Sequence, residues 1–139
     1  MSFTQINDYD SNYSNASNKP FYSGSVILTG ANQTFVNGYT PNLNDVNLNM
    51  VIPYNMKITN FSYSFGRALT SGETYPVNLI RNGVLVENMG PNGDNFDSSS
   101  PQDGSYNVGP IFFVPGDLVH FSVSSFSASS NNELSWCIQ

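Results

Sequence analysis

Residues 75–88 read Tyr-Pro-Val-Asn-Leu-Ile-Arg-Asn-Gly-Val-Leu-Val-Glu-Asn, and this stretch decides the fold class. Tyr75–Arg81 and Val84–Asn88 are two runs rich in residues that favour strands. Asn82-Gly83 between them is the pair that best tolerates the two positive φ angles of a type I′ turn. The stretch therefore predicts an antiparallel β-hairpin.

Further strand-like runs, separated by turn residues, extend in both directions from this hairpin. They are Ser25–Leu28, Gln33–Val36, 46–52, Met56–Phe65, Tyr106–Val114, Leu118–Ser125 and Glu133–Gln139. A change of apolar phase after Ile58 predicts a β-bulge near Thr59-Asn60. About eight strands and no helix favour an all-β fold, an antiparallel jelly-roll β-sandwich rather than an open sheet.

Composition supports the same fold class and excludes several functions. The chain has 139 residues, which suits one domain, and only 10% of them are charged, so the usual helix-surface residues are scarce. The net charge is −6 with four cationic side chains, which excludes a phosphate-binding surface, so we expect no nucleic-acid partner. No apolar run is long enough to span a bilayer, and we expect no membrane insertion.

Residues 1–20 differ in composition from the rest, being rich in Asn, Ser, Asp and Tyr. This segment is either a flexible leader or an extended anchoring peptide that docks on a neighbouring subunit, with Phe3, Ile6, Tyr9 and Tyr13 as its contacts. Residues 21–139 form the expected head domain. The first residues lack the basic and apolar regions of a signal peptide, so synthesis in a host cytoplasm is expected.

Three short motifs together resemble the tumour-necrosis-factor-like and complement-type jelly-roll heads, as found in phage and giant-virus fibre heads and in exosporium collagen-like proteins. The motifs are Leu79–Val84, Ile111–Val114 and Gly116–Phe121, with Ile52–Ile58 at the start of the central strand. The resemblance implies a jelly-roll subunit that forms a homotrimer through aromatic faces and presents loops for adhesion. The ending Leu134–Gln139 and the lack of a collagen-like stalk favour a virus or phage version.

Side chains for catalysis or metal binding are scarce. His120 is the only histidine and Cys137 the only cysteine, so a zinc site, a disulfide within the chain and a Ser-His-Asp triad with its nucleophile elbow are not expected. Glu73 and Glu87 are candidates for a pair of glycosidase carboxylates, but nothing in the sequence places them together. We expect no enzyme activity and no cofactor.

Two groups of residues are candidates for contact with partners. Asp94, Asn95, Asp97 and Asp103 belong to a predicted loop over 89–104, which we expect to be an exposed recognition loop. The loop is either a weak calcium site or ordinary solvated turns. Phe61, Tyr63 and Phe65 share one strand face and form either part of the core or the trimer interface.

These features predict a virion structural protein: a trimeric fibre head, spike or capsid-decoration protein at the virion surface. Its expected partners are further copies of the chain, other capsid or fibre proteins, and host cell-surface glycans. Loops at 38–45, 66–74 and 89–104 would face outward. The alternative is a carbohydrate-binding or spore-surface adhesion head, with Tyr39, Tyr54 or Tyr106 as aromatic platforms for sugars.

Overall fold

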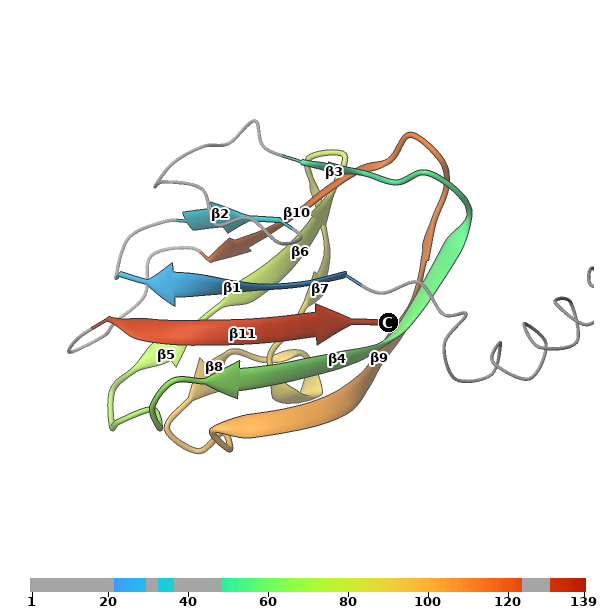
Figure 1. The fold of residues 1–139 in the computed structure, drawn as a ribbon. Coiled ribbons are helices and arrows are strands. Elements are labelled where there is room, and N and C mark those ends of the chain that lie inside the picture. Colours follow the sequence, from blue (N-terminus) through green and yellow to red (C-terminus); the bar gives the residue numbers. More distant parts are fainter. Residues whose placement is uncertain (1–21, 30–32, 37–48, 124–130) are drawn as a thin grey trace, which may run out of the picture.

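The computed structural model describes residues 22–29, 33–36, 49–123 and 131–139 (Figure 1). Over these residues the chain is all-β, with antiparallel sheets, no α-helix and one short 3₁₀ turn, η1 (Pro91–Gly93). Nothing helical in these ranges has the length and apolar character needed to cross a membrane.

Two sheets make up most of the structure (Figure 1). The first has the order β1 (Tyr22–Leu28), β11 (Asn132–Ile138), β4 (Met56–Phe65) and β9 (Asp103–Phe113). The second has the order β2 (Gln33–Phe35), β10 (Leu118–Val123), β6 (Val77–Arg81) and β7 (Val84–Asn88), and β3 (Met50–Val51) also pairs with β10. A small third sheet pairs β5 (Thr74–Tyr75) with β8 (Phe96–Asp97).

The buried faces of both large sheets contribute to one hydrophobic core. Side chains alternate along the strands, so that Val119, Phe121 and Val123 of β10 point inward with almost no exposed surface. Phe61 and Phe65 of β4, in the first sheet, point into the same core and are also buried. Burying each such side chain contributes roughly 1.5–3 kcal/mol.

The predicted bulge in β4 is confirmed. The pairing of β4 with β9 shifts between Ile58 and Asn60, which lets both Ile58 and Phe61 face the core. Gln139 stabilises the bulge through its backbone. The Thr59 and Asn60 amides donate to the Gln139 carbonyl, and the Gln139 amide donates to the Asn60 carbonyl.

The hairpin of residues 75–88 is also confirmed, with Arg81 opposite Val84 and φ angles of 51° at Asn82 and 80° at Gly83. The turn is tied to the tight turn before β10. The Asn82 side chain donates to the Asp117 carboxylate at 2.9 Å and accepts the Leu118 amide at 2.9 Å. The Asp117 carboxylate also accepts the Val114 amide at 2.9 Å, so two turns distant in sequence are held as one unit.

Other elements differ from the expectation. The predicted strand Tyr75–Arg81 is divided between β5 and β6 at Pro76, which has no amide hydrogen for a sheet. The predicted loop over 89–104 contains η1 and β8, and its last residues already belong to β9. Of the expected strand over 46–52, only residues 49–52 are described, and β3 occupies two of them.

The link between the two turns predicts the effect of replacing Asn82. Asn82→Ala removes the side-chain hydrogen bonds and places an alanine at positive φ, and we expect a loss of about 2 kcal/mol in the free energy of unfolding, measured by urea denaturation. Asn82→Gly keeps the turn conformation and loses only the hydrogen bonds, so it should cost less than Asn82→Ala. Equal stability of wild type and Asn82→Gly would show that the side chain does not hold the turns together.

Candidate functional site

The assignment of Phe61, Tyr63 and Phe65 to a trimer interface is wrong for this structure. Their exposed fractions are 0%, 6% and 1%, and all three belong to the core of a single chain. Their rings pack on one another and on Phe96 of β8, with 4.6 Å between the ring centroids of Tyr63 and Phe96. A partner subunit cannot reach side chains that are buried within one subunit.

The acidic segment is not organised as a metal site. Asp94 and Asp103 are exposed, and Asn95 and Asp97 are half-buried. Asp97 accepts hydrogen bonds from the Ser99 amide and hydroxyl, which lower the pKa of its carboxyl group, and Asp103 accepts one from Ser64. Within the described ranges no three His, Cys, Asp or Glu side chains gather in a way that could hold a metal ion. The role of this acidic segment in recognition stays a prediction.

Glu73 has a structural role in this fold. Its buried carboxylate accepts two hydrogen bonds from the Arg67 guanidinium, at 2.7 and 3.1 Å, and others from Thr70 and from the Tyr75 hydroxyl. The hydrogen bonds from Arg67, with those of Thr70 and Tyr75, lower the pKa of Glu73 to about 2. A glycosidase acid needs a raised pKa, so Glu73 is unsuited to that role.

His120 and Cys137 have no catalytic partners among their observed contacts. His120 lies half-buried on β10 with its Nδ1 atom 2.9 Å from Asn49 Oδ1, and burial lowers the pKa of the imidazole. Burial also raises the pKa of the Cys137 thiol, which disfavours the reactive thiolate.

A row of apolar side chains crosses the outer face of the second sheet. Leu118 of β10 is opposite Val51 of β3. Two residues further along β10, His120 is opposite Ile80 of β6, which is opposite Leu85 of β7. Val51, Leu85 and Leu118 expose 64%, 57% and 42% of their surface. The outer face of an antiparallel sheet is usually polar. We call Val51, Leu118, His120, Ile80 and Leu85 the apolar row.

The outer face of the first sheet has the opposite character. Successive strands place Ser25, Ser135, Ser64 and Asp103 side by side. The neighbouring row consists of Ser23, Cys137, Ser62 and Ser105. The Ser62 hydroxyl donates to the Ser105 hydroxyl at 2.9 Å. The outer face of the first sheet therefore has two rows of mainly hydroxyl side chains that the described part of the second sheet lacks, and its exposed apolar side chains Ile27 and Phe112 lie opposite the charged residues Glu133 and Lys57.

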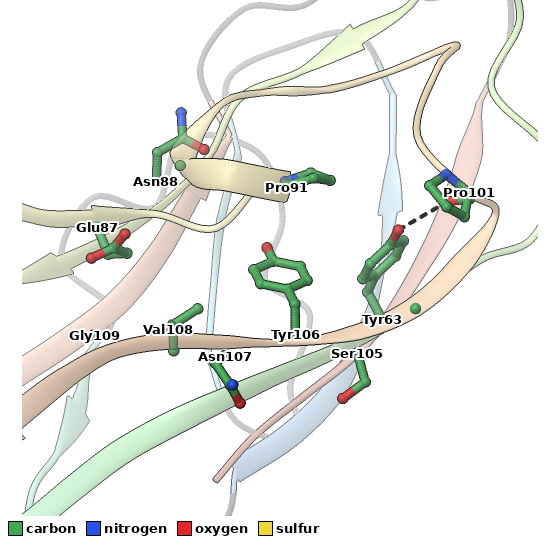
Figure 2. A pocket seen from close by; sticks show the side chains of 12 residues that line it. Tyr63, Glu87, Asn88, Pro91, Pro101, Ser105, Tyr106, Asn107, Val108 and Gly109 are labelled. Atoms are coloured by element: carbon green, nitrogen blue, oxygen red, sulfur yellow. Dashed lines mark hydrogen bonds between the residues drawn. The ribbon is translucent and has the colours of Figure 1, made fainter.

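A cleft of about 450 Å³ lies between the edge strands β7 and β9, beneath η1 (Figure 2). Tyr106, one of the aromatic residues that the sequence suggested for sugar contact, stands in the cleft with its ring pointing away from β9 toward η1 (Figure 2). Glu87 and Asn88 line it from β7. The Tyr106 hydroxyl is buried and has no hydrogen-bond partner within the described part of the chain.

Neither the models of known protein families nor the curated proteins with which the sequence was compared match this chain.

Several predicted residues lie outside the described residues. These are Phe3, Ile6, Tyr9 and Tyr13 of the anchoring peptide, the platform candidate Tyr39, and the loop over 38–45. Tyr54 is described, is 54% exposed and does not line the cleft.

Sequence reasoning missed the apolar row and the cleft. A signal for the row was present, because the runs Leu79-Ile80 and Val84-Leu85-Val86 are apolar at consecutive positions, which leaves one apolar side chain on the outer face. The cleft had no comparable signal, since it depends on two edge strands that are adjacent in space and separate in sequence.

The Glu73 site predicts acid sensitivity. Because the pKa of Glu73 in the folded chain, about 2, lies below its ordinary value of 4.5, its contribution to stability is present above pH 4.5 and is lost as the pH falls toward 2. Glu73→Gln should lower the free energy of unfolding at pH 7 by about 3 kcal/mol, because the Arg67 guanidinium loses its ionised hydrogen-bond acceptor. Urea denaturation between pH 7 and pH 2 measures both effects. If wild type and Glu73→Gln fall in parallel below pH 4.5, Glu73 is not the source of the acid sensitivity.

Proposed function

We propose that this chain is a virion structural protein, a non-catalytic homotrimeric head that serves as a fibre head, spike or capsid-decoration subunit at the virion surface. The observation that carries the proposal is the apolar row, an uncharged surface of Val51, Leu118 and Leu85 on the outside of a folded domain. Exposed apolar surface of this kind marks a site of association with another protein.

The proposed fold for this head is a jelly-roll sandwich. In chain order β1 pairs with β11, β2 with β10, β4 with β9, and β6 with β7. These pairs are nested, like those of one long antiparallel hairpin, and they divide between two sheets as a jelly roll requires. β3 shares the partner of β2, and the pair β5–β8 is an addition at one end.

The proposed partner for the apolar row is a second and a third copy of the same chain. Interface centres are depleted in charged residues, and His120, whose pKa is lowered by burial, is the only titratable member of the row. The threefold number comes from the resemblance to trimeric jelly-roll heads. Three copies on each head and many heads on each particle would raise the avidity of weak contacts with a host surface.

Self-association through the row is tested by light scattering of the purified full chain. We expect the mass of three chains, and a strict monomer at micromolar concentration would refute the trimer. Leu118→Lys should reduce the mass to that of one chain while leaving the circular dichroism spectrum unchanged, because it places a charge in the interface. The matched control is Ile27→Lys, a change at a 54% exposed apolar side chain on the outer face of the first sheet, opposite Glu133. This variant should remain trimeric.

The anchoring peptide is proposed to attach the head to other capsid or fibre proteins. Its aromatic and apolar residues Phe3, Ile6, Tyr9 and Tyr13 would make the contacts. A chain that lacks residues 1–20 should therefore fold and trimerise like the full chain but fail to enter purified particles, as measured by immunoblotting. A truncated chain that enters particles at the wild-type level would reject the anchor.

Adhesion to carbohydrate is a second candidate function, and the cleft beside Tyr106 is the observation that favours it. The cleft combines an aromatic side chain, a carboxylate and an unpartnered hydroxyl, and small polar ligands bind in concave sites with a few such groups. The two functions are compatible, because the cleft and the apolar row involve different residues.

A further inference from the structure

We propose that the cleft between β7 and β9 binds one unit of a neutral saccharide, with the Tyr106 hydroxyl as hydrogen-bond donor and the Glu87 carboxylate as acceptor. The inference rests on the proposed adhesive function and adds the site and the class of ligand. Three observations support it: the position of the cleft, the unpartnered hydroxyl of Tyr106, and the charge of the side chains that line the cleft.

The position of the cleft follows from the topology. β9 ends the first sheet and β7 ends the second, so the cleft lies where the two sheets are open to solvent. Gly90 holds the segment before η1 close to the following turn, since a Cβ atom there would lie 1.5 Å from the Asp94 carbonyl oxygen. The roof over Tyr106 is thus built by the close packing of this segment.

Tyr106 cannot move away to satisfy its hydroxyl. Its ring packs edge-on against Phe61 at a centroid distance of 5.7 Å and against Tyr63 at 6.2 Å. A buried hydroxyl without a partner is unfavourable, and such a group in a concave site points to a ligand that completes it. Tyr63 differs in this respect, because its hydroxyl donates to the Pro101 carbonyl at 3.1 Å (Figure 2).

The other polar side chains that line the cleft are either hydrogen-bonded or point away from it. The Asn88 amide donates to Asn95 at 3.1 Å, and its carbonyl oxygen accepts the Gly90 amide at 3.0 Å. Ser105 and Asn107 point to the other side of β9, where Ser105 bonds to Ser62 (Figure 2). Tyr106 and Glu87 therefore remain as the side chains that can recognise a ligand.

The charge of the lining decides the class of ligand. Among the described residues, no Lys, Arg or His lines the cleft, and Glu87 contributes a negative charge, so this lining disfavours phosphate, sulfate and acidic sugars. Burial, with Tyr63 and Glu87, raises the pKa of the Tyr106 phenol, which keeps it protonated as a donor at neutral pH. A ligand must then accept from a phenol and donate to a carboxylate, and adjacent hydroxyls of a neutral sugar do both.

Apolar walls complete the match with a sugar. Pro91, Pro101 and the tyrosine rings present carbon surface on opposite sides of the cleft (Figure 2). A sugar ring has C–H groups on its faces and hydroxyls at its edge. The cleft volume of about 450 Å³ lies within the usual range for small-ligand sites.

The test is a titration of the ¹⁵N-labelled full chain, followed by amide chemical shifts. The probes are the methyl glycosides of glucose, galactose, mannose, N-acetylglucosamine and N-acetylgalactosamine, with sialyllactose and inorganic sulfate as anionic probes. We expect at least one neutral glycoside to shift the amides of Glu87, Gly93 and Tyr106, and neither anion to do so. Shifts from the anions alone, or from no neutral probe at millimolar concentration, would overturn the proposal, since water would then suffice for the Tyr106 hydroxyl.

Matched variants locate the site. Tyr106→Phe and Glu87→Gln should each weaken the binding of that glycoside at least tenfold, and Tyr106→Phe should raise the unfolding temperature by removing an unpartnered hydroxyl. Tyr54→Phe, at an exposed tyrosine outside the cleft, should leave binding unchanged. Unchanged binding in both cleft variants would reject this site. Light scattering of the same samples separates the two proposals: a trimer that binds no sugar refutes only the cleft, and a monomer that binds sugar refutes only the trimer.

Discussion

The hydrogen bonds of Asn82 with Asp117 and Leu118 are the constraint on which the arrangement of the strands depends. They join the β6–β7 turn to the turn between β9 and β10, with distances of 2.8–2.9 Å. The Ile52 amide and carbonyl bond to the same segment through Asp117 and Gly116. The ends of β3, β6, β9 and β10 thus meet at one place, as the upper part of Figure 1 shows.

This junction sets the register of β10 against β6. A slip by one residue would move every side chain of β10 to the opposite face, exposing Val119 and Phe121 and burying His120. The same register places His120 beside Ile80 on the outer face. At the same junction, the hydrogen bonds of Ile52 with Asp117 and Gly116 hold β3 where Val51 lies beside Leu118. The core and the proposed association surface are therefore two results of one set of hydrogen bonds.

Local patterns were sufficient to predict several parts of the fold. Asn82-Gly83 identified the hairpin, and the phase change after Ile58 identified the bulge, because both depend on a few neighbouring residues. Partners that are distant in sequence could not be inferred in this way. The pairing of β5 with β8 and the cleft depend on contacts across the fold, and nothing in residues 89–104 alone indicates them.

The aromatic residues of β4 show why a functional assignment from alternation can fail. Phe61, Tyr63 and Phe65 alternate in the same way whether their face meets a second sheet or a second subunit. The structure decides for the core, with Phe121 and Phe96 packed against Phe61. The exposed apolar side chains that we propose as an association surface come with an interruption of alternation, the apolar residues at consecutive positions in β6 and β7.

The two outer faces suggest a division of roles within one head. The serine-rich face carries hydroxyls that bond to one another, the apolar row faces outward on the other sheet, and the cleft opens at the edge between them. A head that associates through the apolar row leaves the cleft available to a ligand. This arrangement would suit a subunit that is both part of an assembly and a contact with a host surface.

Carbene footprinting of the full chain, read by mass spectrometry, tests the central claim most directly because it reports the exposure of individual side chains. We expect Val51, Leu85 and Leu118 to be protected from labelling, whereas Ile27, with a similar exposure of 54% in the single chain, should be labelled in proportion to that exposure. Labelling of all four in proportion to their exposure in the single chain would contradict the claim that the apolar row is an interface.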